Sequence, residues 1–267
     1  MNLPFAVDHF PHRLAAVLLI VASGVTSCAA PADPHLDAEQ AVEKYSKRLK
    51  LAPADVSTYI KRADVYFQLH EFALAVKDYS RALQLDENAD QAYYGRGLAY
   101  GRQGLIEEGI GDLGIYIQRN PQSSLAYTKR GVRYLWLGEK EKAFKDLSTA
   151  IKLDPRNAEA HDDLGVILAQ RGEFEKALVH FSTTVTLDPS YQKGHHNLAM
   201  VYYIVGNNEA AFNAVQHSLA LRPDFRDSML LKSKILHALG RISEAQALEE
   251  EAAFLPQGDW SEHAPVQ

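Results

Sequence analysis

The chain repeats itself at a fixed interval of 34 residues. The segments LDPRNAEAH (153–161) and LDPSYQKGH (187–195) share their first three residues and their final histidine, and they lie 34 positions apart. Stepping by this interval from Val56 gives six frames without an insertion or deletion, which begin at residues 56, 90, 124, 158, 192 and 226. A fixed period of this length is typical of a solenoid, in which one supersecondary unit is stacked on copies of itself.

Side-chain size alternates within each frame. The fourth and eleventh residues are bulky in every frame, whereas the eighth is always small. Positions 4, 8 and 11 lie on one face of an α-helix, so a flat site between two large side chains lets a neighbouring helix approach closely. The eighth residues are Ala63, Gly97, Gly131, Gly165, Ala199 and Ser233.

The second half of each frame predicts another helix. Five frames have glycine at position 15, where a left-handed residue ends a helix, and four have proline at position 32, where proline stops the following helix. Position 20, between them, is alanine or glycine in all six frames. The pattern therefore predicts an all-α chain made of helix pairs.

A helix-turn-helix unit of this length and pattern resembles the tetratricopeptide repeat (TPR). The segments AYTKRGVRYLWLGEKEKAFKDLSTAIKLDP (126–155) and AHDDLGVILAQRGEFEKALVHFSTTVTLDP (160–189) match its signature in nearly every position. The resemblance implies a right-handed TPR superhelix of about six repeats over residues 56–257, with a continuous shared core. Residues 37–55 are expected to hold a capping helix and residues 258–267 a polar tail.

Three glycines interrupt one predicted second helix. Gly109, Gly111 and Gly114 satisfy the spacing GxGxxG, but they do not lie between a strand and a helix, so no nucleotide-binding loop is predicted. Each glycine costs about 0.8–1.0 kcal/mol of helix stability relative to alanine. We therefore expect the second repeat to be the loosest, with the glycines leaving room for the ring of Tyr116.

The N-terminus predicts export and lipidation. Leu14–Ser27 is a run of apolar and small residues that suits a signal peptide and is too short to span a membrane. Its end, Val25-Thr26-Ser27-Cys28, resembles the bacterial lipobox, which implies that residues 1–27 are removed and that Cys28, the only cysteine, is lipidated. The alternative is an ordinary signal peptide cleaved near Ala29.

Residues 28–36 are then expected to be a lipidated cysteine and a short extended tether. Ala29 follows the cysteine, and by the sorting rule of proteobacterial lipoproteins this implies the periplasmic side of the outer membrane. Cleavage without lipidation implies a soluble periplasmic or secreted protein instead.

Composition and motifs exclude several function classes. The chain has 28 Lys and Arg against 34 Asp and Glu, and no dense basic run, so nucleic acid is an unsuitable partner. His161 and His195 occupy equivalent positions of successive frames, which lie roughly 10 Å apart in packed helices and are too distant to share one zinc ion. We expect no metal, no cofactor and no enzymatic activity. A hydrolase activity that disappears in a His195→Ala variant would contradict this.

The resemblance also implies a binding surface, because the first helices of TPR pairs line a concave groove that holds peptide segments of partner proteins. The TPR clamp for a chaperone's C-terminal carboxylate is missing, since Ile60, Asp64 and Gly95 stand where it needs lysine and asparagine. The mixture of aliphatic and aromatic residues favours a hydrophobic peptide or an amphipathic helix. The candidate groove residues are Ile60, Tyr94, Leu98, Val132, Trp136, Val166, His196, Met200 and Tyr203.

A lipid anchor followed by a TPR array is similar in plan to outer-membrane lipoproteins that act as pilotins for type IV pilus secretins, or as adaptors for peptidoglycan hydrolases and synthases. The predicted function is therefore that of a non-catalytic, membrane-anchored periplasmic scaffold for protein partners. The alternative is an accessory subunit of an exported enzyme or secretion complex, for example in peptidoglycan hydrolase regulation.

Overall fold

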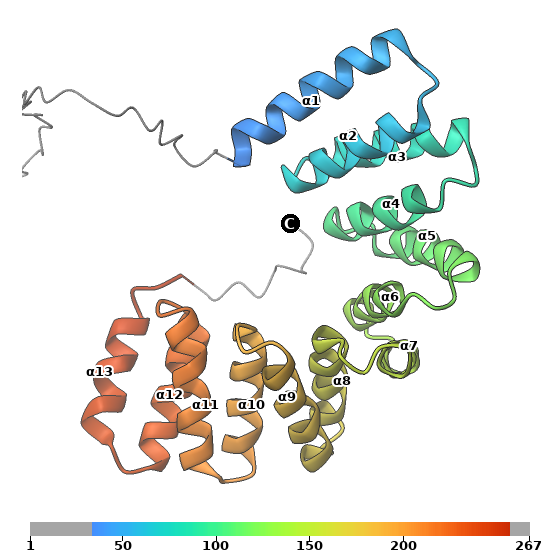
Figure 1. Cartoon of the computed structure of the whole chain (residues 1–267). Helices are drawn as coiled ribbons and strands as arrows, with labels where there is room; N and C mark the ends of the chain where they lie inside the picture. The colour runs from blue at the N-terminus through green and yellow to red at the C-terminus, as the bar shows by residue number, and fades with distance from the viewer. Residues whose placement is uncertain (1–33, 257–267) are drawn as a thin grey trace, which may run out of the picture.

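Helix pairs follow one another along an arc (Figure 1). The computed structural model describes residues 34–256, and within this range the chain forms thirteen α-helices and no strand, so the predicted all-α solenoid is confirmed. A single helix, α1 (Pro34–Leu51), precedes six pairs. The first helices of the pairs are α2 (Val56–Gln68), α4 (Asp90–Arg102), α6 (Ser124–Trp136), α8 (Ala158–Gln170), α10 (Gln192–Ile204) and α12 (Arg226–Ala238). The second helices are α3 (Phe72–Leu85), α5 (Ile106–Arg119), α7 (Lys140–Leu153), α9 (Phe174–Leu187), α11 (Asn208–Leu221) and α13 (Ile242–Ala252).

Each first helix begins at the first residue of one of the six sequence frames. α1 begins at Pro34, so the last three residues of the expected tether are helical. The signal peptide, Cys28 and residues 257–267 lie outside the described residues. None of the helices described between residues 34 and 256 combines the length and apolar character needed to cross a membrane.

The repeat supplies its own helix boundaries. Asp55, Ser123 and Asn157 cap α2, α6 and α8, because each side chain accepts a hydrogen bond from the backbone N–H three residues later, at 3.1, 3.3 and 3.0 Å. Position 15 has a positive φ in all six pairs. Five of these residues are glycine, and the sixth, His70, has a φ of 61°, a conformation that only glycine adopts without strain.

The small eighth residue allows the two helices of a pair to touch. A Cβ atom added at Gly165 would lie 2.8 Å from the ring of Phe181, and one at Gly131 would lie 2.9 Å from Cγ of Leu147. Phe181 and Leu147 are themselves almost fully buried. The large side chain of each second helix therefore fills the space that the first helix leaves open.

Three arginines of the first helices pair with aspartates of the second helices at the repeat interval. Arg62, Arg96 and Arg130 each donate through Nε and Nη2 to both carboxylate oxygens of one aspartate, at 2.6–2.9 Å. Each guanidinium also lies within 6 Å of two tyrosine rings of its own helix. The paired aspartates, all buried, are Asp78, Asp112 and Asp146.

A serine of the preceding helix, α1 or α3, completes two of these ion pairs. Arg62 Nη1 donates to Ser46 Oγ at 2.9 Å, and Arg96 Nη1 donates to Ser80 Oγ at 3.0 Å. In the third repeat Gly114 occupies the equivalent position, and a Cβ atom added there would lie 3.7 Å from Arg130 Nη1. The Arg130–Asp146 ion pair therefore lacks the serine hydroxyl that accepts from Nη1 of the arginine in the first two ion pairs.

Replacing Gly114 by serine should stabilise the fold by about 1–2 kcal/mol. The new hydroxyl would accept from Arg130 Nη1, which contributes about 1 kcal/mol, and serine has a higher helix propensity than glycine. Urea unfolding followed by circular dichroism measures the gain. Gly111→Ser is the matched control, because a Cβ atom at Gly111 meets nothing within 4 Å and only the propensity term of about 0.5 kcal/mol applies. Equal gains for the two variants would show that no new hydrogen bond forms.

The remaining glycine of α5 has a packing role. A Cβ atom at Gly109 would lie 2.8 Å from the carbonyl oxygen of Gly97 and 3.2 Å from Nε of Arg133, so this glycine lets α5 touch α4. The expectation that the three glycines make room for Tyr116 is wrong, because Cβ atoms added at Gly109 and Gly114 meet other residues and one added at Gly111 meets nothing within 4 Å. The ring of Tyr116 packs instead against Tyr94, with ring centroids 5.0 Å apart.

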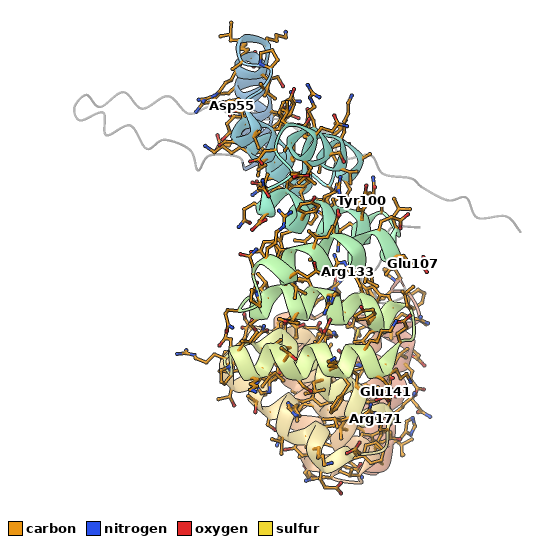
Figure 2. The ribbon with its side chains drawn as sticks, turned by 90° about the vertical axis from the view of Figure 1, so that its right-hand side faces the viewer. Asp55, Tyr100, Glu107, Arg133, Glu141 and Arg171 are labelled. Atoms are coloured by element: carbon orange, nitrogen blue, oxygen red, sulfur yellow. The ribbon has the colours of Figure 1, made fainter. Side chains whose placement is uncertain are left out.

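The first helices line the inner side of the arc. Among the described helices, successive first helices touch one another along the whole series, whereas successive second helices do not. In Figure 1, α4 and α6 accordingly lie inside α5 and α7. Figure 2 views the molecule from the outer side, where Arg171 Nη2 donates to Glu141 Oε1 at 2.6 Å and links the third and fourth repeats.

Candidate peptide-binding groove

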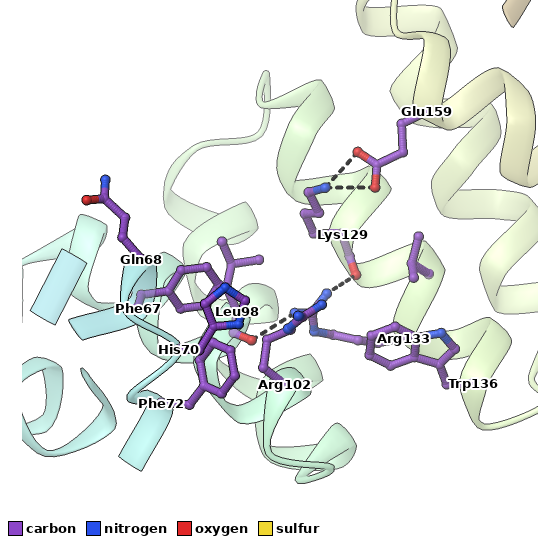
Figure 3. A pocket seen from close by; sticks show the side chains of 11 residues that line it. Phe67, Gln68, His70, Phe72, Leu98, Arg102, Lys129, Arg133, Trp136 and Glu159 are labelled. Carbon is purple, nitrogen blue, oxygen red and sulfur yellow. Dashed lines mark hydrogen bonds and ion pairs between the residues drawn. The ribbon is translucent and has the colours of Figure 1, made fainter. Parts of the chain in front are cut away.

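The inner side of the arc is hollowed at two adjoining places. The larger opening, here called the aromatic pocket, has a volume of about 460 Å³ (Figure 3). Its lining comprises Phe67, Gln68, His70, Phe72, Leu98, Arg102, Lys129, Val132, Arg133, Trp136 and Glu159. The second, here called the N-terminal hollow, has a volume of about 450 Å³. Its lining comprises Ile60, Asp64, Phe67, Gln68, Tyr79, Gln91, Tyr94, Gly95 and Leu98. Because the two share three residues, they form one continuous groove across α2, α4 and α6.

Aromatic rings and guanidinium groups together form the wall of the aromatic pocket. The rings of Phe67 and Phe72 meet edge to face, with centroids 5.3 Å apart. The guanidinium carbon of Arg102 lies 5.4 Å from the Phe72 ring centroid, and that of Arg133 lies 5.6 Å from the Trp136 ring. The pocket therefore offers apolar surface and positive charge side by side.

Arg133 is an unusually buried cation. Its residue is 4% exposed, and its guanidinium donates to two backbone carbonyls, from Nη1 to Lys129 O at 2.7 Å and from Nη2 to Leu98 O at 3.3 Å. Within residues 34–256 its Nε–H has no acceptor. Burial lowers the pKa of Arg133 to about 10, an effect that Glu159 partly opposes, so the group stays charged at neutral pH.

The lysine of the pocket is already paired with a carboxylate. Lys129 Nζ donates to both carboxylate oxygens of Glu159, at 2.6 and 2.7 Å, and this ion pair links α6 to α8. Both side chains are about one-fifth exposed. This lysine therefore adds no net positive charge to the pocket.

The N-terminal hollow is shaped by a tyrosine that crosses it. Tyr79 Oη donates to Asp64 Oδ1 at 2.6 Å, and a Cβ atom at Gly95 would lie 2.3 Å from Cζ of that tyrosine. Glycine at position 95 is thus required for Tyr79 to span from α3 to α2. Tyr94 also lines this hollow, and burial raises the pKa of its hydroxyl to about 12.

The structure brings together five of the nine candidate groove residues. Ile60, Tyr94, Leu98, Val132 and Trp136 line the two openings.

The other four lie further along the arc and line neither opening. Val166 and Tyr203 pack partly buried against the core, and Met200 is 38% exposed. His196 is 6% exposed, and its Nδ1 lies 2.9 Å from Ser228 Oγ, so its side chain packs between α10 and α12 rather than facing a partner.

His161 and His195, which end the two similar segments 153–161 and 187–195, contact the turns that precede their own helices. His161 Nε2 lies 3.1 Å from the carbonyl oxygen of Pro155, and His195 Nε2 lies 3.0 Å from that of Pro189. Within the described range, no cluster of three or more His, Cys, Asp or Glu residues has a geometry that could hold a metal ion.

Arg133 was not among the candidate residues, although the sequence contains a signal that distinguishes it. It occupies position 10 of its frame, where the other five frames have an apolar residue. A single charged residue in an otherwise apolar series is a signal that an alignment of the internal repeats makes visible. The apolar equivalents are Val65, Ala99, Ile167, Val201 and Ile235.

Comparisons with protein families identify the repeat unit. Residues 63–104 match the family model described as "TPR repeat", and residues 128–191 match the one described as "Tetratricopeptide repeat". No curated protein sequence matches the chain significantly.

Solved structures share the fold. The structure of the APC/C hetero-tetramer Cut9-Hcn1 has a TM-score of 0.68 and 16% identity over 80% of this chain, which spans only 44% of that chain. YrrB, described as a TPR protein with an unusual peptide-binding site, has a TM-score of 0.56 and 25% identity, covering 74% of this chain and 99% of its own. PilW, described as a widely conserved type IV pilus biogenesis factor, has a TM-score of 0.66 and 18% identity, covering 73% and 91%. With a 34-residue helix pair repeated in register and two matching stretches, this chain is a solenoid of tetratricopeptide repeats.

Proposed function

We propose that this chain is a lipid-anchored adaptor on the periplasmic side of the outer membrane, without catalytic activity of its own, that holds partner proteins in the groove across α2, α4 and α6. The observation that carries the proposal is this continuous groove, in which partly exposed aromatic and aliphatic side chains face the inside of the arc. Surfaces of this kind accept an extended peptide or an amphipathic helix. Similarity to the pilus factor PilW and to the peptide-binding TPR protein YrrB supports a role in assembling other proteins.

Trp136→Ala should reduce partner capture by about tenfold or more, because a tryptophan in a pocket is a typical binding hot spot. The measurement is quantitative mass spectrometry of proteins that co-purify with the tagged chain from detergent-solubilised membranes. Val179→Ala is the matched control, since this residue of α9 is 65% exposed and lies outside both openings. Binding through the groove is contradicted if both variants lose the captured protein equally, or if neither variant loses it.

The anchor is tested separately by metabolic labelling with a fatty acid. Wild-type protein should incorporate the label and fractionate with outer membranes, whereas Cys28→Ala should do neither, because the thioether cannot form. A wild-type protein that carries no label would support cleavage of an ordinary signal peptide near Ala29 and a soluble product.

A further inference from the structure

We infer that the aromatic pocket is a subsite for an internal acidic residue of the bound peptide, whose carboxylate pairs with Arg133 while a neighbouring apolar side chain packs on the rings of Phe67, Phe72 and Trp136. The inference rests on the proposed peptide groove and specifies its ligand. The partner would be a protein segment in which aspartate or glutamate adjoins an aromatic or aliphatic residue.

The surroundings of Arg133 are adapted to its side chain, because neighbouring positions have smaller residues than their equivalents in the other repeats. A Cβ atom at Gly101 would lie 2.6 Å from its Nη2, and one at Gly109 would lie 3.2 Å from its Nε. Position 20, which Gly109 occupies, is alanine in the other five frames, and position 12, which Gly101 occupies, is glycine only here. An apolar residue at position 133, as in the other repeats, would need neither space.

Among the described residues, Glu159 offsets the charge of Arg133 only in part. Two of its five N–H groups bond to carbonyl oxygens, and within the described part of the chain none of its nitrogens lies within 4.0 Å of a carboxylate oxygen. Arg102, on the same pocket wall, adds a second guanidinium and further disfavours the charged form of Arg133. A carboxylate that enters this site gains charge-assisted hydrogen bonds where water is largely excluded.

The shape of the groove indicates an internal residue rather than a chain end. The aromatic pocket opens into the N-terminal hollow through Phe67, Gln68 and Leu98, so a peptide seated over Arg133 has a surface on which to continue. The lysine of the pocket, Lys129, is already paired with Glu159 and so does not serve as an unpaired cation for a second carboxylate. The pairing therefore selects one acidic side chain within a longer segment.

Fluorescein-labelled decapeptides with acetylated and amidated ends test the inference. The probe has a Glu-Phe pair in a glycine and serine background, and fluorescence anisotropy measures its binding to the full chain. We expect Glu-Phe to bind at least about tenfold more tightly than Gln-Phe, since a buried charge pair is broken. Because this comparison changes only the peptide, it does not depend on the folding of a variant.

Arg133→Met should remove the preference for glutamate over glutamine while retaining the preference for phenylalanine over serine. Arg156→Met is the matched control, because this exposed arginine lies in the turn before α8 and outside the pocket. It should leave both preferences unchanged. Circular dichroism of each variant establishes that the helices are intact.

Several results would overturn the inference. These are a wild-type protein that binds Glu-Phe and Gln-Phe equally, a glutamate preference that survives in Arg133→Met, and binding confined to peptides with a free terminal carboxylate. Probe binding seen only after removal of residues 257–267 would assign the pocket to the chain's own segment instead. If the probes fail but membrane capture still depends on Trp136, the acidic subsite is wrong and the proposed groove stands.

Discussion

Asp146→Ala is expected to lower the free energy of unfolding by about 3 kcal/mol. The carboxylate accepts from Arg130 Nε at 2.7 Å and from Nη2 at 2.9 Å, and the aspartate is 4% exposed. Removing it leaves a partly buried guanidinium between two tyrosine rings without a counter-charge, which typically costs 3–5 kcal/mol, at the lower end here because Arg130 keeps some contact with water. Urea unfolding at neutral pH measures the change.

The double variant Arg130→Leu, Asp146→Ala should recover most of this loss. It copies the fifth repeat, which has Leu198 and Ala214 at the two equivalent positions and forms the same helix pair without an ion pair. Replacing both members of a buried pair by apolar residues is often nearly neutral, whereas removing one is costly. If the double variant is as unstable as Asp146→Ala, the ion pair makes a net stabilising contribution, and the loss in the single variant does not come from the unpaired arginine.

Acidification from pH 7 to pH 4 is expected to remove about 3 kcal/mol of stability through His196 alone. Burial lowers the pKa of His196 to about 4, from an ordinary value of 6.5. The unfolded chain therefore binds a proton that the folded chain excludes, so the stability is fully present above pH 6.5 and is lost as the pH falls toward 4. Burial also lowers the pKa values of His161 and His180, which adds to the effect in the same direction.

The contribution of His196 is isolated by His196→Asn, whose amide can replace Nδ1 in the contact with Ser228 Oγ. Urea unfolding at a series of pH values gives the difference in stability between the wild type and this variant. The free energy of unfolding of the wild type, relative to that of the variant, should fall by about 3 kcal/mol between pH 7 and pH 4. A difference that stays constant with pH would show that His196 is able to charge within the fold.

Much of the fold was predictable because the same pattern of residue types recurs in all six frames. The glycine at position 15 follows from local backbone geometry, so the helix boundaries could be predicted without tertiary contacts. His70 illustrates the strength of the repeat, since a residue that disfavours a positive φ adopts one where its five equivalents are glycine. The early start of α1 also has a local cause, because proline is well accommodated in the first turn of a helix.

The groove was only partly predictable, because it depends on which repeats diverge from one another. Tyr94, Leu98 and Trp136 were placed by position in the repeat alone. The burial of His196 was not foreseen, because it depends on how α12 packs on α10 and not on the pattern of its own helix. The Arg–Asp pairs join residues 16 positions apart on two helices, and only superposition of the first three frames reveals them.

Site-specific photo-crosslinking in intact cells tests most directly whether partners bind on the inner side of the arc. A crosslinking amino acid at Tyr94, in the N-terminal hollow, is compared with one at Val179, on the exposed face of α9. The groove account predicts a discrete crosslinked protein from position 94, which is lost when Trp136→Ala is added, and none of that protein from position 179. Crosslinks to the same partner from position 179 and none from position 94 would contradict it.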